Sequence, residues 1–399
     1  MKVLWVNTNL LHPTTKGGQI RTLEILRELK HRHEIHYVAI EDPEHPEASA
    51  KSREYCARAY PFRHAIPSKR PLSFARQVAG NLFSDVPLAV SRFHPPGLGE
   101  FLRQLMSKER FDRAVVDHLA PTAYFPDLAH SLLFQHNVET MIWRRHAEHA
   151  PDPIRRAFFR LQAARMFEYE RRACRAAGHI VAVSAVDSEM MRKLFGVERI
   201  SEIPTGVNID YFAPPEAATP GADLVFVGSM DWLPNIDGVL WFVREVLPLI
   251  RAGRPSCTLA IVGRTPPPKI AALADQAPGV TVTGTVPDVR PHLWGASVSI
   301  VPLRIGGGTR LKIYEAMAAK VPVVSTAVGA EGLHVNPPHD IRIGNTPEEF
   351  AACCLELLGS AEARVQIAER AWAMVCANFS SQHVADSFSD TLERAPALP

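Results

Sequence analysis

Two series of short apolar segments, each the length of a buried strand, alternate with helical stretches along this chain of 399 residues. The first series lies between residues 2 and 184, and the second lies between residues 223 and 326. Such alternation is typical of a parallel sheet, because a parallel connection needs a crossover that usually contains a helix. A stretch without periodicity at 204–222, rich in proline, glycine and alanine, separates the two series. The sequence therefore predicts two doubly wound α/β domains.

The domain boundary is expected inside this connecting stretch. It gives an N-terminal Rossmann-like domain over residues 1–205 and a C-terminal Rossmann-like domain over residues 206–379. In two such domains that face one another across a cleft, the carboxyl ends of both sets of strands lie where open α/β sheets bind ligands. Catalytic and binding residues are therefore expected directly after strands.

The composition argues against several other classes of protein. Lys plus Arg at 44 and Asp plus Glu at 42 leave a formal charge of +2, too balanced to predict a nucleic-acid-binding protein. The six cysteines are scattered and include no C-x-x-C pair, so their spacing indicates reduced thiols in a cytoplasm. No run approaches the roughly 18 apolar residues of a membrane span. The N-terminal apolar run is broken by Asn7 and Asn9, unlike a signal peptide.

The most informative segment is 301–333, in which three consecutive glycines stand between a predicted strand and a predicted helix. Glycines let the backbone approach a ligand closely, and the free amides and the dipole at a helix N-terminus favour a phosphate. Two cations and a glutamate follow within the first turns of this helix. The residues expected at this site are Gly306, Gly307, Gly308, Thr309, Arg310, Leu311, Lys312 and Glu315.

These groups together predict a nucleotide site. The carboxylate of Glu315 can accept two hydroxyl hydrogen bonds, as a ribose would offer, and the glycine segment can bind phosphate. The spacing does not match G-x-x-x-x-G-K-[ST], which disfavours a P-loop nucleotidase. The alternative is an amphipathic helix with a glycine-rich start and no ligand.

A glycine pair, Gly17 and Gly18, follows the first predicted strand and precedes a helix. Taken alone, the pair favours a loop that needs a positive φ over an anion site, but its position directly after a strand narrows the difference. The segment lacks G-x-G-x-x-G and the acid that follows it in dinucleotide-binding domains. A dinucleotide-dependent dehydrogenase is therefore disfavoured.

The segment EAMAAKVPVV at 315–324 resembles the motif E-A-M-A-x-G-x-P-V of the retaining glycosyltransferases of family 4, which have the GT-B architecture. Lys320 replaces the motif glycine, Gly307 occupies the position of an upstream glutamate, and the chain is similar to the subset with G-G-G-T-R-L-K. IPTGVNIDYFAP at 203–214 resembles the interdomain connection of the family. The resemblance covers nearly the whole chain and implies that residues 380–399 cross back to the first domain as a helix.

The resemblance also implies roles for individual residues. Glu315 would contact the nucleotide ribose, and the backbone near Val286 would contact the base. The loop at Gly17 and Gly18 would close over the phosphates. The family commonly binds the donor pyrophosphate through a Gly-Arg pair followed by a lysine, whereas this chain has Gly228 and Ser229 and no such lysine. We expect the missing charge to come from Arg310, Lys312 and Arg264.

Polar residues also follow two predicted strands of the N-terminal half. Asp117 and His118 end one strand, and His136, Asn137 and Glu139 follow the next. The family often has a histidine at the first place, and either Asp117 or His118 is its counterpart. A lone histidine at a strand end is more often structural, but two polar clusters at neighbouring strand ends favour function. We expect Asp117, His118 and His136 to orient donor and acceptor.

No metal is expected, because the chain contains no D-x-D and HRHEIH at 31–36 is not H-E-x-x-H.

Residues 144–175 carry many arginines interleaved with apolar residues. A basic amphipathic helix can lie on an anionic membrane. A long helix packed on the sheet, with a solvated arginine face, is the favoured interpretation, and peripheral membrane contact is the alternative.

The sequence thus predicts a metal-independent retaining glycosyltransferase of the hexosyltransferase type that needs no cofactor. It would move a sugar from a nucleoside-diphosphate sugar to a hydroxyl group of a glycan or lipid-linked acceptor, in the cytoplasm or at the inner face of the cell membrane, for bacterial polysaccharide assembly. The expected catalytic residues are His118, Asp117, Arg310 and Lys312. The alternatives are a nucleotide-sugar epimerase or hydrolase, and a non-catalytic nucleotide-sugar-binding protein. No nucleic-acid partner is expected.

Overall fold

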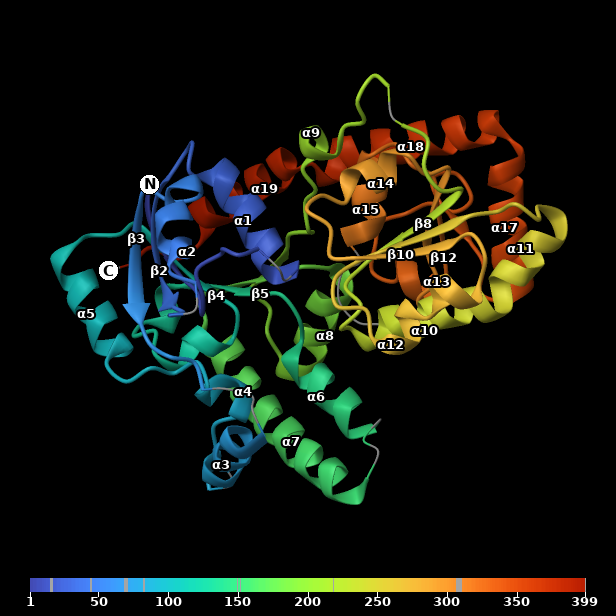
Figure 1. The fold of residues 1–399 in the computed structure, drawn as a ribbon. Coiled ribbons are helices and arrows are strands. Elements are labelled where there is room, and N and C mark those ends of the chain that lie inside the picture. The colour runs from blue at the N-terminus through green and yellow to red at the C-terminus, as the bar shows by residue number, and fades with distance from the viewer. Residues whose placement is uncertain are drawn as a thin grey trace. The chain divides into compact units, whose positions relative to one another are not determined.

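The computed structural model describes residues 1–14, 17–43, 45–67, 71–81, 83–148, 150, 152–217, 219–305 and 311–398. The chain forms two compact units, which Figure 1 shows. The first unit contains Met1–Pro204 together with Val384–Pro399, and the second contains Thr205–His383. The division between them lies in the proline-rich connection, and the C-terminal segment belongs to the first unit.

The first unit contains a parallel sheet of seven strands in the order β3-β2-β1-β4-β5-β6-β7. The order reverses beside β1, so the loops after β1 and β4 meet at a topological switch point, the usual ligand position in open α/β sheets. The strands are β1 (Lys2–Val6), β2 (Glu34–Glu41), β3 (Arg58–Arg63), β4 (Arg113–Asp117), β5 (Leu132–Gln135), β6 (His179–Ala182) and β7 (Ile200–Glu202).

Helices cover both faces of this sheet, because alternate residues of each strand point to opposite faces. Val3 and Trp5 of β1 pack in one core with α1 and α19, whereas Leu4 and Val6 pack in another with α5 and α8. The helices of this unit are α1 (Gly17–Leu29), α2 (Glu47–Lys51), η1 (Ser52–Glu54), α3 (Pro71–Asn81), α4 (Leu88–Ser91), α5 (Leu98–Lys108), η2 (Ala120–Ala123), η3 (Leu128–His130), α6 (Glu139–Glu148), α7 (Pro153–Ala176), α8 (Ala185–Phe195) and, largely, α19 (Ser381–Arg394).

The C-terminal helix α19 is part of the core of the first unit. Phe388 is fully buried, and its ring lies 5.3 Å from that of Trp5 and 5.2 Å from that of Phe134. Figure 1 shows α19 beside α1. Burial of these aromatic rings against β1 and β5 holds the helix on the sheet.

The second unit contains a parallel sheet of six strands in the order β10-β9-β8-β11-β12-β13. They are β8 (Leu224–Val227), β9 (Leu259–Val262), β10 (Val280–Gly284), β11 (Val298–Val301), β12 (Val323–Ser325) and β13 (Arg342–Ile343). The helices are α9 (Ile209–Phe212), α10 (Leu233–Trp241), η4 (Phe242–Val246), α11 (Leu247–Gly253), α12 (Pro268–Ala271), α13 (Leu273–Gln276), α14 (Arg290–Trp294), α15 (Leu311–Ala318), α16 (Ala327–Ala330), α17 (Pro347–Gly359) and α18 (Ala361–Phe379).

The predicted fold class of two doubly wound parallel sheets is confirmed, with differences at the sheet edges and in one helix. The edge strands β3, β7 and β13 were not predicted, because they are short or only partly buried and lack a continuous apolar run. In the second unit, the helical stretch between β8 and β9 contains a π-helical segment, η4. Pro248 at the start of α11 has no N–H to bond the carbonyl of Arg244, which explains the wider turn.

Among the helices that the structure describes, none is both long enough and apolar enough to cross a membrane.

Candidate functional site

The carboxyl ends of β4 and β5 bring polar side chains together in the first unit. Asp117 ends β4, His118 follows it, and His136 comes directly after β5. These strands are neighbours, with Asp117 opposite Phe134. Arg21 of α1 reaches the same place. We call Arg21, Asp117, His118 and His136 the histidine cluster.

The carboxylate of Asp117 is fully buried and accepts four hydrogen bonds. Its Oδ2 accepts from Trp5 Nε1 at 2.9 Å, from Asn7 Nδ2 at 2.7 Å and from Thr22 Oγ1 at 2.8 Å. Its Oδ1 lies 2.7 Å from His136 Nε2. Burial raises the pKa of Asp117, while these donors and the nearby cations oppose the rise. Asp117 is thus a buried anchor and not a group that a substrate can reach.

The buried ring of His136 has one defined tautomer. Arg21 Nη1 can only donate, and it lies 2.9 Å from His136 Nδ1, so this nitrogen is the acceptor. Nε2 therefore carries the proton and donates to Asp117. Burial and the neighbouring Arg21 hold the pKa of His136 well below its usual value. His136 is therefore neutral and is held in place from both sides.

Of the two histidines, His118 is the one whose side chain reaches solvent. Its backbone has a left-handed φ of 72°, and its N–H donates to the Phe134 carbonyl at 2.9 Å. The ring stacks on His136 with centroids 3.8 Å apart, and its side chain is 30% exposed. A Cβ at Gly18 would lie 2.9 Å from His118 Cε1, so only glycine fits there without a shift. The structure thus brings Gly18, His118 and His136 together.

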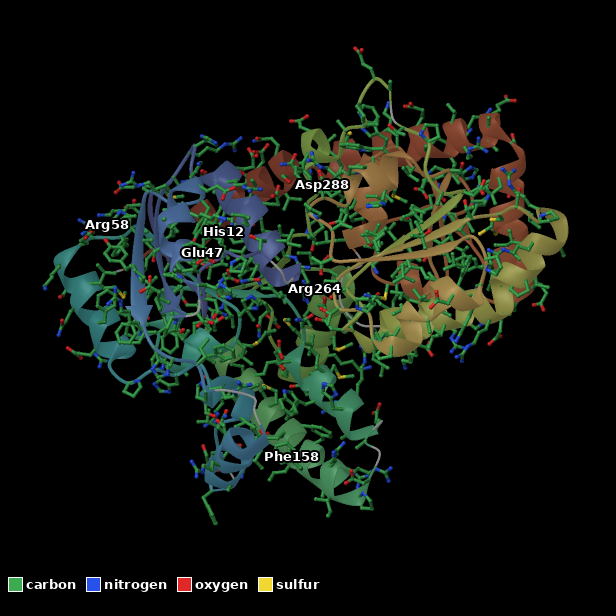
Figure 2. The ribbon with its side chains drawn as sticks, in the orientation of Figure 1. His12, Glu47, Arg58, Phe158, Arg264 and Asp288 are labelled. Atoms are coloured by element: carbon green, nitrogen blue, oxygen red, sulfur yellow. The ribbon has the colours of Figure 1, made fainter. Side chains whose placement is uncertain are left out.

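The loop that leads from β1 toward Gly17 is anchored along its described part. Tyr37 Oη donates to the carbonyl of Asn9 at 3.0 Å. The ring of His12, labelled in Figure 2, places Nε2 2.7 Å from Glu54 Oε2. These contacts hold the loop close to β2 and η1.

Ligand atoms of Asp117, His118 and His136 lie within 4.8 Å of one another, a spacing that a metal ion could bridge. Both ring nitrogens of His136 are already engaged, one by Arg21 and one by Asp117. To coordinate Nδ1 of His136, a metal ion would have to displace the guanidinium of Arg21. The residues present therefore do not fit a metal site, and metal independence remains a prediction.

Asn137 and Glu139 lie at the start of α6, where Glu170 of α7 caps the helix. Glu170 accepts from the N–H of Glu139 at 2.9 Å, and from the N–H and hydroxyl of Thr140 at 2.8 and 2.6 Å. Burial raises the pKa of both Glu139 and Glu170 to about 7. Asn137 bonds the Glu139 side chain and opposes this rise.

The second unit gathers another polar group at the ends of β8 and β9. Arg264, which follows β9 (Figure 2), donates from Nε to Ser229 Oγ at 2.8 Å. Ser229 donates in turn to Asp231 Oδ1 at 2.5 Å, and Arg264 Nη2 lies 3.4 Å from Asp231 Oδ2. A Cβ at Gly263 would lie 1.9 Å from the Gly228 carbonyl, so the two loops meet backbone to backbone.

Lys312, on the first turn of α15, reaches the same backbone. Its Nζ donates to Asn235 Oδ1 at 2.9 Å and lies 4.4 Å from the centre of the Phe226 ring. A Cβ at Gly228 would lie 2.6 Å from this ammonium. Two cations, Arg264 and Lys312, therefore lie beside the Gly228–Ser229 backbone. We call these two residues the cation pair.

Glu315 follows Lys312 on the same face of α15, because residues three apart on a helix are neighbours. The side chain is half-buried, and burial raises its pKa to about 7 against the opposing effect of Lys312. Val286 lies after β10, half-buried against the core of the second unit.

Part of the predicted nucleotide site cannot be placed. Gly306, Gly307, Gly308, Thr309 and Arg310 lie outside the described residues. The segment before them ends at Ile305 and the segment after them begins with Leu311, the first residue of α15.

Sequence reasoning missed Arg21, Asn235 and Glu170. Arg21 was visible as the arginine of GGQIRT, one turn after the glycine pair. Asn235 is one of several polar residues in DWLPNIDG, and nothing in the sequence distinguishes it. Glu170 differs from the exposed Glu168 only in the face of α7 that it occupies.

Comparison with known families gives two adjoining matches. Residues 15–211 match the family described as Glycosyltransferase Family 4, and residues 221–360 match the family described as Glycosyl transferases group 1. Among curated proteins, an uncharacterized 44.6 kDa protein in the cps region of Klebsiella pneumoniae is 21% identical over 400 residues, covering 97% of this chain and 98% of that protein.

Solved structures share the fold over nearly the full length of the chain. Sucrose-phosphate synthase from Thermosynechococcus elongatus has a TM-score of 0.71 at 16% identity, with 98% of each chain covered. Anabaena Alr3699/HepE, in complex with UDP and glucose, has a TM-score of 0.68 at 12% identity, with 99% of this chain and 100% of that chain covered.

The raised pKa of Glu170 predicts a pH-dependent stability. A carboxyl group with a folded pKa near 7 binds its proton more tightly in the native state than in the unfolded state, where the pKa is about 4.5. The free energy of unfolding should therefore fall as pH rises from about 4.5 to about 7. Glu170→Gln, which remains uncharged, should reduce this fall, measured as the melting temperature from pH 5 to pH 8.

Glu168→Gln provides the matched control, because Glu168 is an exposed carboxylate on the same helix. It should leave the pH dependence as in the wild type. An unchanged pH dependence in Glu170→Gln would show that Glu170 is ionised in the native state throughout this range.

Proposed function

Because the chain belongs to the family 4 glycosyltransferases of the GT-B fold, we propose that it transfers a sugar from a nucleoside-diphosphate sugar to a hydroxyl group of an acceptor. The observation that carries the proposal is the cation pair, Arg264 and Lys312, beside the Gly228–Ser229 backbone. Departure of a nucleoside diphosphate builds negative charge on its phosphates, and positioned cations stabilise that charge. The second unit is thus proposed as the donor-binding domain.

The cation pair supports donor binding by a chain that has no arginine at position 229. The guanidinium of Arg264 enters from the end of β9 and bonds Ser229 Oγ, so it places a cation directly beside position 229. Lys312 approaches Gly228 from α15. Arg310 remains a predicted third cation. Glu315, on the face of α15 that carries Lys312, is proposed to accept hydrogen bonds from the ribose hydroxyls.

The first unit is proposed as the acceptor-side domain. His118 is half-exposed at a strand end, while Asp117 and His136 are buried beneath it. We assign the contact with substrate to His118, and positioning roles to Asp117 and His136. Asn137 and Glu139 remain proposed ligand contacts at the start of α6, and Gly17 and Gly18 remain proposed contacts of the donor phosphates.

The finer features of the reaction are also proposed. Family membership supports transfer of a hexosyl group with retention of anomeric configuration. Metal independence is supported by the cation pair, which supplies charge where a metal would otherwise be needed. A cps-region relative supports a role in polysaccharide assembly, with a glycan or a lipid-linked acceptor. The six cysteines are all unpaired, which supports a reducing cytoplasm.

Donor binding tests the proposal directly. HepE is solved with UDP and glucose, so UDP and UDP-glucose are the first probes, with GDP and ADP sugars beside them. Removing one charged contact to a phosphate should weaken binding about tenfold, or about 1.4 kcal/mol. Arg264→Met and Lys312→Met should each show this loss in isothermal titration.

The control is Lys269→Met, because Lys269 is an exposed lysine on α12 of the same unit. It should bind the donor like the wild type. Equal donor affinity in the wild type and in both cation-pair variants would contradict the proposed phosphate site. Release of the nucleotide at the same rate with and without any acceptor would favour the hydrolase alternative, and binding without turnover would favour a non-catalytic protein.

We also propose that the first turns of α7 contact an anionic membrane surface. Ile154 is 84% exposed, and it lies beside exposed Arg155 and Arg156, with Arg160 and Leu161 one turn on. Figure 2 shows Phe158 on the same helix, in a region that extends away from the sheet of the first unit. Exposed apolar side chains among arginines suit the boundary between lipid headgroups and acyl chains.

Vesicle flotation measures this contact. The wild type should float with vesicles that contain phosphatidylglycerol and not with phosphatidylcholine alone. A variant with Arg155, Arg156 and Arg160 changed to Gln should lose most of this binding, because each arginine near an anionic surface contributes about 1 kcal/mol. Changing Arg171 and Arg172, at the other end of α7, should have little effect. Undiminished binding of the triple variant would remove the proposal.

A further inference from the structure

A cavity of about 290 Å³ lies in the first unit among α3, α4 and the residues between them. Its walls carry amide, hydroxyl and guanidinium groups. The lining residues are Pro67, Gln77, Gly80, Asn81, Ser84, Leu88, Ser91 and Arg92. No role described above uses this cavity.

Arg92 is the cation of this cavity, and it has no acidic partner among the residues that the structure describes. The one hydrogen bond of its guanidinium to a described residue runs from Nη2 to the Pro67 carbonyl at 2.6 Å. Nε is shut off from solvent and meets no acceptor in the described part of the chain. Burial alone lowers the pKa of this arginine. A half-buried guanidinium without a carboxylate is costly, and an oxyanion beside it would offset part of that cost.

The ends of α3 and α4 that line the cavity are tied together by buried amides. Asn81 donates to the Val86 carbonyl at 2.7 Å and accepts from Gln162 Nε2 at 2.8 Å. Gln162, fully buried in α7, accepts from the N–H of Leu88 at 2.9 Å. These bonds join the two sides of the cavity through α7. The cavity is therefore preformed, which reduces the entropy cost of binding a ligand.

Gly80 and Ser84 also line this cavity, and they offer open space and a further donor. A Cβ at Gly80 would meet no atom of a described residue within 4 Å, so this wall has open space beside it in the described part of the chain. Ser84 Oγ accepts from the N–H of Val86 at 3.1 Å, which leaves its own hydrogen to donate to a ligand. A cation, a hydroxyl group and a cavity of this size suit a phosphate or carboxylate group that is attached to a sugar ring.

The cavity belongs to the same edge of the sheet as His118. The chain enters α3 and α4 after the carboxyl end of β3, and α4 packs against η2, which follows β4. Val90 of α4 shares a core with Leu119, the residue directly after His118. Figure 1 shows α3 and α4 beside α7 in the first unit. A ligand in this cavity would therefore lie on the acceptor side of the first unit.

We propose that the cavity at Arg92 binds an oxyanion of the acceptor, a phosphate or a carboxylate carried next to a sugar ring. The assignment of this anion to the acceptor rests on the proposed function, whereas the anion site itself does not depend on that function. It narrows the acceptor class from any glycan or lipid-linked glycan to an anionic one.

Titration followed by the Nε–H resonances of arginine tests the site. The probes are glucose 1-phosphate, glucuronate, dihexanoyl phosphatidylglycerol below its micelle concentration, and neutral glucose, each added with UDP in excess to occupy the donor site. The Arg92 resonance is the one that disappears in Arg92→Lys. We expect at least one anion to shift it and glucose to leave it unchanged.

Affinity of the responding anion should fall about tenfold in Arg92→Gln, and less in Arg92→Lys, which keeps the charge. Arg76→Gln, at an exposed position of α3, should match the wild type. Glucose 1-phosphate or the lipid as the responding probe would identify a phosphate, and glucuronate would identify a carboxylate. No shift with any anion, or unchanged affinity in Arg92→Gln, would overturn the proposal.

UDP binding is measured separately in the same samples. Failure of UDP to bind, together with a response at Arg92, would contradict the proposed function and leave the anion site intact. Binding of UDP without any response at Arg92 would contradict only the proposed anion site.

Discussion

The buried carboxylate of Asp117 is the contact on which the first unit's site depends. It joins Trp5 of β1, Asn7 of the following loop, Thr22 of α1 and His136 after β5 through four hydrogen bonds. Three separate segments of the chain are thereby held against the end of β4, where the strand order reverses. Removal of either partner from such a buried polar network leaves a desolvated group without its bond, which is more costly than the bond is favourable. The network therefore fixes one arrangement of these side chains, in addition to stabilising the folded unit.

That geometry decides what His118 can do. Arg21 and Asp117 hold His136 in one neutral tautomer, and the ring of His136 forms the surface on which His118 stacks. Gly18 closes the other side. A histidine with a left-handed backbone, packed between a ring and a glycine, is held in a strained conformation of the kind that clusters at functional sites. The buried residues are thus positioning groups, and the half-exposed ring is the group offered to a ligand.

The sequence predicted the two parallel sheets because their central strands are buried on both faces and so form continuous apolar runs. It also predicted that Asp117, His118 and His136 would lie at strand ends. It could not distinguish the buried Asp117 from the half-exposed His118, because this depends on four donors that come from distant parts of the chain. In the second unit, glycines marked the loop at Gly228, but the meeting of Lys312 with this loop depends on the packing of α15. Arg92 and its cavity gave no sequence signal, since neither spacing nor periodicity marks them.

The role of His118 is measured most directly by the rate at which UDP is released from a UDP-sugar that binds the wild type. This rate is compared between the wild type, His118→Ala and His136→Gln, and the dissociation constant of UDP is measured on each. We expect His118→Ala to lower the rate about 100-fold, with UDP affinity unchanged. His136→Gln should lower it less, because the amide nitrogen of Gln can take the place of Nε2 and keep the bond to Asp117. His136→Ala, which loses this bond, should lower it more than His136→Gln does. A rate in His118→Ala equal to that of the wild type would contradict the central claim that this ring acts on the substrate.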